Sequence, residues 1–198
     1  MKRQLLYEKD YTFENDVVRI DALKLEHADY LSGIAQDEKV WRYFLEKGSS
    51  DIVKYCNNAL ENRKREEEYP FALFDKRAHG YAGMTRLYDY SPELCVIKMG
   101  HTWIGRDYWG TELNRNVKYL LFEFIFDQLN LERVGFGVHS QNIRSVRALQ
   151  GIGCEQEGVL KSFLPGGKNG QRIDLLLFSL LKSEWNRSVK KMMKNQLQ

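Results

Sequence analysis

The feature that most constrains the fold is a predicted strand, loop and helix in the middle of the chain. Cys95–Trp103 has the pattern of an extended segment, and the turn that follows, Ile104–Gly110, ends in glycine. From Thr111 onward apolar residues recur at helical spacing, namely Leu113, Val117, Leu120, Leu121, Phe124 and Leu129. A stripe of this kind predicts a long helix whose apolar face is buried in a core.

Further elements are predicted before this unit. Val17–Ala22 has the pattern of a short strand, and the apolar residues of Leu25–Ile34 then change to helical spacing. Ser49–Asp51 supplies capping residues for a second helix, which Arg63–Glu68 continues as a charged end. Pro70 is expected to stop that helix, because proline cannot continue the backbone ladder.

Extended segments dominate the rest of the chain. Phe71–Asp75 and Tyr81–Tyr88 lead to Cys95–Trp103 through turn signals, which predicts an antiparallel meander. After the central helix the expected elements are a strand at Arg133–Val138, a short helix at Ser145–Gly151 and two closing strands, Glu157–Leu164 and Ile173–Leu181, around a Pro165–Gly167 turn.

This order of elements predicts an α/β (α+β) fold, with a mixed sheet of about six to seven strands and helices on both faces. The length of 198 residues favours a single domain over 1–198. Its core is expected at about 17–185, with a helical tail at 186–198.

Composition narrows the class of protein. Hydrophobic residues make up 43% of the chain and charged residues 29%, a balance typical of a globular protein. No stretch approaches the ~18 uncharged apolar residues of a membrane span, and the start lacks the apolar run of a secretory signal, which predicts a cytoplasmic protein. Cys56, Cys95 and Cys154 lack paired or metal-ligand spacing, so structural thiols and no metal site are expected.

The charge balance gives little sign of a nucleic-acid partner. The chain has 30 basic and 27 acidic residues, interspersed along most of its length, for a net charge of +3. Only the tail is locally basic, through Arg187, Lys190, Lys191 and Lys194. A solvated lysine face on a terminal helix is expected there, with contact to phosphates as the alternative.

The loop before the central helix has the properties of an anion seat. Backbone N–H groups in the first turn of a helix have no intrahelical partner and carry the positive end of the helix dipole. A pyrophosphate can bind there without basic side chains. Gly110 would then allow close approach of the ligand, or it is simply a loop glycine.

Two ordered motifs resemble one family. The stretch Gly100–Asn114 resembles the acetyl-CoA loop of the GCN5-related N-acetyltransferases, the GNAT superfamily, and in particular of its Rim-type branch, which acetylates the N-termini of ribosomal proteins. A second block resembles the same branch in the same order: Leu131–Val134, Asn142–Ser145, Ala148–Leu149, Gly151–Gly158, Asp174 and Glu184–Trp185. The likeness is close over 100–185, and before Leu94 it extends only to the order of elements.

The resemblance implies a GNAT fold whose mostly antiparallel sheet is splayed between the strands near 96–103 and 133–138. The pantetheine arm of acetyl-CoA would pair with the first of these strands, and the pyrophosphate would lie on backbone groups of Arg106–Leu113. The expected cofactor contacts are Met99, His101, Thr102, Trp103, Arg106, Trp109, Gly110, Thr111, Glu112, Leu113, Asn114, Asn142 and Ser145.

Two residues are candidates for catalysis. Ser145 matches the serine that, in this branch, is proposed to protonate the leaving thiolate, but it could equally cap the helix Ser145–Gly151. His101 is the best local candidate for the base that deprotonates the amine, or it is a sheet residue satisfied by a carbonyl or water.

The chain departs from the family pattern at two positions. Lys98 stands where relatives usually carry an acidic residue, so a carboxylate base at that position is missing. Glu112 stands where glycine or alanine is common, and its carboxylate would oppose a pyrophosphate unless it turns outward. An acidic residue in a first helical turn can also simply complement the dipole.

The leading hypothesis is an acetyl-CoA-dependent N-acetyltransferase that acts through a ternary complex on a primary amine. The resemblance favours a protein N-terminal α-amine, with small-molecule amines as the alternative. Two other functions remain: a GNAT-fold module that binds CoA without turnover, motivated by Lys98 and Glu112, and a nucleic-acid adaptor that uses the basic tail. A homodimer could form through an exposed sheet edge.

Overall fold

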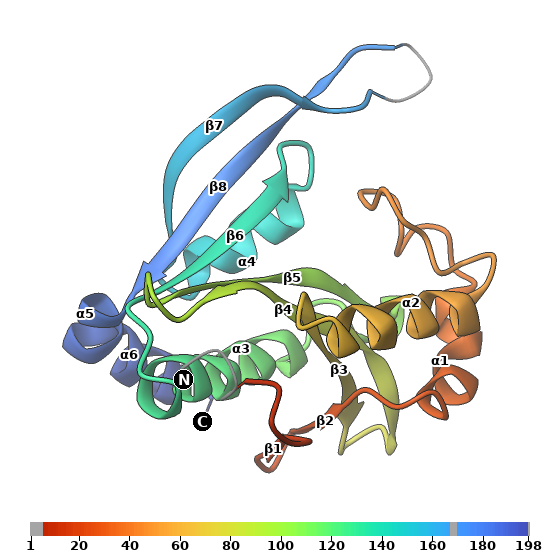
Figure 1. The fold of residues 1–198 in the computed structure, drawn as a ribbon, viewed down its shortest axis with the longest axis horizontal. Coiled ribbons are helices and arrows are strands. Elements are labelled where there is room, and N and C mark those ends of the chain that lie inside the picture. Colours follow the sequence, from red (N-terminus) through yellow and green to blue (C-terminus); the bar gives the residue numbers. More distant parts are fainter. Residues whose placement is uncertain (1–5, 167–169, 198) are drawn as a thin grey trace.

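The computed structural model describes residues 6–166 and 170–197, and eight strands join in one sheet (Figure 1). Their order across the sheet is β1-β2-β3-β4-β5-β6-β8-β7, and the pair β5–β6 is parallel while the other pairs are antiparallel. The strands are β1 Thr12–Glu14, β2 Val18–Ala22, β3 Glu68–Asp75, β4 Gly80–Ser91, β5 Val96–Ile104, β6 Arg133–His139, β7 Glu155–Leu164 and β8 Ile173–Leu181. The expected mixed, mostly antiparallel sheet is confirmed, with β1 as an additional strand that is too short to show a period.

Helices cover both faces of the sheet, as expected. They are α1 His27–Ala35, α2 Ile52–Lys64, α3 Leu113–Glu123, α4 Ile143–Gly151, α5 Lys182–Glu184 and α6 Lys190–Gln196. Successive side chains of a strand point to opposite faces, and β3 follows this rule. Phe71 and Leu73 join the core that contains α3, whereas Ala72 joins the core formed with α1 and α2.

The end of α2 corrects one prediction. Its start is as expected, because the Asp51 carboxylate accepts a hydrogen bond from the Lys54 N–H at 2.8 Å. The helix ends at Lys64, however, and Glu68 and Pro70 belong to β3. The carbonyl of Pro70 accepts a hydrogen bond from the Leu23 N–H, just past the end of β2. The pairing of β2 with β3 stops at this point, so the strand tolerates a proline, which has no N–H to donate.

The central helix has the expected buried stripe, with one irregularity. α3 continues as a π-helical segment, Phe124–Gln128, in which the Leu129 N–H bonds to the Phe124 carbonyl at 2.9 Å. The wider turn brings Leu129 against the same core as Leu113 and Val117.

The C-terminal segment is part of the core, which extends beyond the expected 17–185. A π-helical segment, Trp185–Val189, connects α5 to α6, and Trp185, Val189 and Met193 are buried in the core that contains α3. Cys56 and Cys154 are buried free thiols and Cys95 is half-buried. Of the predicted Pro165–Gly167 turn, Gly167 lies outside the described residues.

Candidate active site

Strands β5 and β6 separate to form an open split in the sheet. Their parallel pairing covers only Val96–Lys98 of β5 and ends at the pair Lys98–Gly135. Beyond this point β5 continues to Ile104 and β6 to His139, but the two strands no longer pair with each other, and they diverge in Figure 1. The expected splay is therefore confirmed. Along Met99–Ile104 the edge of β5 that faces β6 has no ladder partner, which leaves backbone groups that an extended ligand can pair with.

A bulge interrupts β5 inside this split. Met84 of β4 pairs with Trp103 and Arg86 pairs with Gly100, so Thr85 alone opposes both His101 and Thr102. His101 has a φ of 49°, a strained value for a residue with a β-carbon, and Thr85 Oγ1 lies 2.7 Å from Thr102 Oγ1. The extra residue reverses the alternation of β5.

This reversal decides whether the side chain or only the backbone of each predicted cofactor-binding residue of β5 faces the split. In a regular strand Met99, His101 and Trp103 would share one face. Here Met99 is buried in the core that contains α3, and Trp103 is buried on the opposite face against Trp41. Only the backbones of Met99 and Trp103 are thus open to the split, whereas the His101 ring is 38% exposed.

The loop from β5 to α3 has the geometry of an anion seat. Gly110 has a φ of 78°, which favours glycine, and no atom lies near the position of a β-carbon. The next hydroxyl, Thr111 Oγ1, donates to the Tyr108 carbonyl at 2.8 Å and accepts weakly from the Leu113 N–H at 3.3 Å. Glu112 makes no side-chain cap, so the N–H groups that follow Leu113 in the first turn of α3 stay open to an anion.

The other loop residues have identifiable partners. Glu112 turns outward and pairs with Arg77 at 3.0 Å, so its carboxylate has a counter-charge. Arg106 is exposed and pairs with Asp37 at 3.4 Å. Leu113 is buried in the core, and Asn114 is half-buried at the start of α3.

The start of α4 corrects a second prediction. The helix begins at Ile143 rather than at Ser145, and its N-cap is Asn142, whose Oδ1 accepts a hydrogen bond from the Ser145 N–H at 3.2 Å. The Ser145 hydroxyl is therefore not needed as a cap. The amide nitrogen of Asn142 has no hydrogen-bond partner among residues 6–166 and 170–197, which leaves it free to donate to a ligand.

Arg144 connects α4 to the loop across the split. Its guanidinium carbon lies 3.4 Å from the centre of the Trp109 ring, and the indole N–H of Trp109 donates to the Ile104 carbonyl at 2.7 Å. Burial lowers the pKa of Arg144. Sequence analysis did not single out Arg144, because the contact depends on the approach of two segments distant in sequence.

A buried ion pair lies behind His101. Glu68 Oε2 accepts a bond from Arg86 Nη1 at 2.8 Å, and Glu68 Oε1 lies 4.0 Å from His101 Nε2. The Arg86 side chain is 1% exposed and stacks over the Tyr55 ring at 4.5 Å. Lys98, by contrast, points to solvent and pairs with Asp89 at 2.9 Å.

Burial and neighbouring charges tune these groups. The pKa of His101 is lowered, first by burial and then by the positive charge of Arg86, although Glu68 opposes the shift. Burial raises the pKa of Tyr55 to about 12. His101 is consequently neutral at pH 7 and able to accept a proton.

Sequence analysis also missed three residues near the split. They are Glu68 and Arg86 behind His101, and Lys118 of α3, whose Nζ lies 3.4 Å from Met99 Sδ. A signal existed for two of them: Arg86 interrupts the apolar pattern of a strand, and Lys118 lies at helical spacing with the core residues Leu121, Phe122 and Ile125. Glu68 gives no signal, because it ends the charged run Arg63–Glu68, which has the pattern of a solvated helix end.

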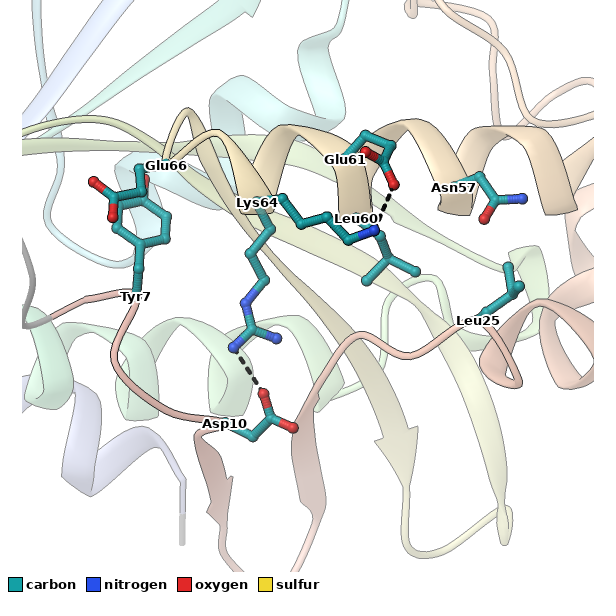
Figure 2. A pocket seen from close by; sticks show the side chains of 9 residues that line it. Tyr7, Asp10, Leu25, Asn57, Leu60, Glu61, Lys64 and Glu66 are labelled. Carbon is teal, nitrogen blue, oxygen red and sulfur yellow. Dashed lines mark hydrogen bonds and ion pairs between the residues drawn. The ribbon is translucent and has the colours of Figure 1, made fainter.

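A hollow elsewhere on the molecule contains none of the expected residues. It has a volume of about 540 Å³ and lies between α2 and the N-terminal segment (Figure 2). Its charged side chains are largely paired with one another, as Arg63 is with Asp10 at 2.7 Å and Lys64 with Glu61 at 2.7 Å.

The split sheet and helix N-terminus agree with a family assignment. Residues 18–155 match the model of the acetyltransferase (GNAT) domain family. The chain belongs to this family. It is thus an acyltransferase, as its sequence predicts. No helix in the described part of this GNAT acetyltransferase is long and apolar enough to cross a membrane.

Individual relatives agree with the assignment. An uncharacterized N-acetyltransferase of Bacillus licheniformis, p20, is 25% identical over 181 residues, which cover 88% of this chain and 98% of that protein. An acetyltransferase crystal structure from T. thermophilus is 28% identical, with a TM-score of 0.81 over 94% of this chain and 97% of the other. Mycobacterium smegmatis RimJ, solved in complex with CoA-disulfide, shares the fold at 17% identity, with a TM-score of 0.75 over 90% and 88% of the two chains. Rim-type proteins are therefore among the solved structures that share the fold of this chain.

Proposed function

We propose that this GNAT acetyltransferase transfers the acetyl group of acetyl-CoA to a primary amine, by direct attack within a ternary complex. The observation that carries the proposal is the split between β5 and β6, with the N-terminus of α3 beyond the open end of β5. An unpaired strand edge suits the amide groups of a pantetheine chain, and an open helix N-terminus suits a pyrophosphate. Acetyl-CoA supplies the acetyl group as an activated thioester.

Backbone groups and side chains of the protein bind different parts of acetyl-CoA. In this proposal the backbone of Met99–Trp103 pairs with the pantetheine. The pyrophosphate is bound by those backbone N–H groups of Arg106–Asn114 that make no hydrogen bond inside the protein, unlike those of Tyr108 and Trp109. The free amide N–H of Asn142 donates a hydrogen bond to the pantetheine. Trp109 and Arg144 lie on either side of the entrance to the split. Because Glu112 is neutralised by Arg77, it does not repel the phosphates.

His101 and Glu68 provide the base in this proposal. The amine must lose a proton to attack, and neutral His101 accepts it at Nε2 or through one water molecule. Glu68 lies 4.0 Å from that nitrogen and stabilises the imidazolium that forms. The carboxylate that relatives carry at the position of Lys98 is thus replaced by one from the neighbouring part of the sheet.

The remaining groups balance the reaction. A backbone N–H in the His101–Trp103 bulge polarises the thioester carbonyl, and loss of one such donor typically costs about 3 kcal/mol of transition-state stabilisation. The C–N bond forms as the C–S bond breaks, and the electron pair of the broken bond stays on sulfur. The acetylated nitrogen loses its second proton to solvent, and Ser145 passes a proton to the sulfur and regains one from solvent, so that free CoA leaves as a thiol.

Acidic and aromatic groups favour a cationic amine as the acceptor. Glu68 lies beside His101, and the negative charge of Glu46 also acts on the His101 ring. Tyr43 extends from the α1–α2 connection to contact His139 at the end of β6, at 4.9 Å between ring centres. A protein N-terminal α-amine or a small-molecule amine fits this description, in a cytoplasmic protein. A homodimer through the edge strand β7 belongs to the same proposal.

The test combines binding and turnover on one sample. Isothermal titration with acetyl-CoA and with CoA is followed by thiol release with a panel of amines and N-terminal peptides. We expect binding in the micromolar range and release that falls roughly 100-fold in Ser145→Ala. The matched control is Ser32→Ala, at an exposed serine of α1. Binding without release from any amine would indicate a CoA-binding module instead, and no binding would refute the proposal.

A further inference from the structure

Lys118 is a buried cation at the apex of the split. It belongs to α3, and its side chain is 5% exposed. Its Nζ lies 3.4 Å from Met99 Sδ and 5.0 Å from the centre of the Phe136 ring. Met99 and Phe136 directly follow the last paired residues of β5 and β6, so the ammonium lies where the strands begin to separate.

The surroundings give this charge no partner. Among the described residues no carboxylate lies within ion-pair distance of Lys118, and the neighbouring groups are a thioether, an aromatic ring and the buried thiol of Cys154. Burial lowers the pKa of Lys118 to about 8. An unpaired buried ammonium destabilises a fold, and a methionine of similar length would pack in its place. Folding alone therefore does not explain a lysine here.

The position of Lys118 limits which group of a bound ligand its ammonium could interact with. The pyrophosphate seat lies at the first turn of α3, whereas Lys118 is in the second turn, toward the closed end of the split. A cationic amine would be repelled. The remaining candidate is the sulfur end of CoA, which becomes negative during acetyl transfer.

We propose that Lys118 is a catalytic residue whose ammonium stabilises the thiolate of CoA at the apex of the split. This inference rests on the proposed function. As the C–S bond breaks, the electron pair stays on sulfur, and the Lys118 ammonium balances that charge until a proton arrives. Ser145, which is neutral, provides no such counter-charge.

The experiment measures the thiol of bound CoA directly. Thiolate absorbance is titrated with pH in the CoA complex, as a difference from the CoA-free protein so that the cysteines cancel. In the wild type we expect the pKa of the bound CoA thiol to lie about 1 unit or more below that of free CoA, because a nearby opposite charge favours the thiolate. At a pH below both values this corresponds to a roughly tenfold larger thiolate fraction. Lys118→Met should abolish the shift and lower kcat roughly 10- to 100-fold.

Two further variants separate charge from packing. Lys98→Met is the matched control, because Lys98 lies at the last strand pair but is exposed and paired with Asp89, and it should keep the shift. Lys118→Arg retains a charge and should retain part of the shift. Lys118→Met should also raise Tm, because it removes an unpaired buried charge.

Two results would overturn the inference: a wild-type complex whose CoA titrates like free CoA, or an equal shift in Lys118→Met. The first needs no variant, so it applies even if Lys118→Met does not fold. Failure of the wild type to bind CoA is a different outcome, which refutes the proposed function and this inference with it.

Discussion

His101 lies in the bulge of β5 with its ring against Tyr88, at 5.4 Å between ring centres, and with Glu68 behind it. If it is the base, His101→Gln should lower kcat/KM roughly 100-fold, since positioned general bases contribute factors of this order. The matched control is His79→Gln, at an exposed histidine of the β3–β4 turn. Equal activity of the two variants in an amine acetylation assay would exclude His101 as the base.

The pH profile gives a second measure of the same residue. Because the pKa of His101 lies below its usual 6.5, its neutral form persists at pH 7 and is lost only as the pH falls through that lowered value. The acidic limb of kcat/KM should therefore lie below pH 6.5. Glu68 raises this pKa, so Glu68→Gln should move the limb to still lower pH, while Tm reports the separate cost of weakening the Arg86 pair.

At the scale of the element, the N-terminus of α4 combines a structural and a functional role in one side chain. Asn142 Oδ1 caps the helix, and its amide nitrogen is the proposed donor to CoA. Asn142→Asp keeps the cap but loses the donor, so Tm should stay within about 1 °C or rise, while the Kd for CoA increases roughly tenfold. Asn142→Ala loses both and should also lower stability by about 1 kcal/mol.

Calorimetry and thermal unfolding on the same preparations separate the two roles. An Asn142→Asp variant that binds CoA like the wild type would remove Asn142 from the binding site and leave it only as a cap.

At the scale of the whole molecule, the C-terminal segment is both basic and structural. Val189 and Met193 are buried, and Lys190 pairs with Asp127 at 2.7 Å. Truncation after Trp185 should therefore destabilise the protein, by roughly 3–6 kcal/mol if each buried side chain contributes its usual share. Chemical denaturation measures this loss, and an unchanged midpoint would contradict the packing.

The same segment carries the nucleic-acid alternative, and charge can be removed there without loss of packing. Lys191 and Lys194 are exposed on α6. The double variant Lys191→Gln/Lys194→Gln should leave stability unchanged, so it is the control for the truncation and the cleaner test of salt-dependent RNA binding.

Most elements were predictable from sequence, because short-range patterns set them. The apolar stripe of α3 and the cap at Asp51 depend only on residues near in the chain. The predictions failed where a distant strand intervened. Pro70 and Glu68 lie in β3 because β4 pairs with them, and no local pattern announces that pairing.

The candidate site divides in the same way. The sequence by itself determined the family and the strand, loop and helix that form the predicted anion seat at the start of α3, because both depend on contiguous motifs. Only the tertiary structure decided the faces of β5, since the bulge at His101 is defined by its register with β4. It likewise brought Glu68 behind His101 and Lys118 beneath the split, because these contacts join separate elements whose approach is set by packing of the whole sheet.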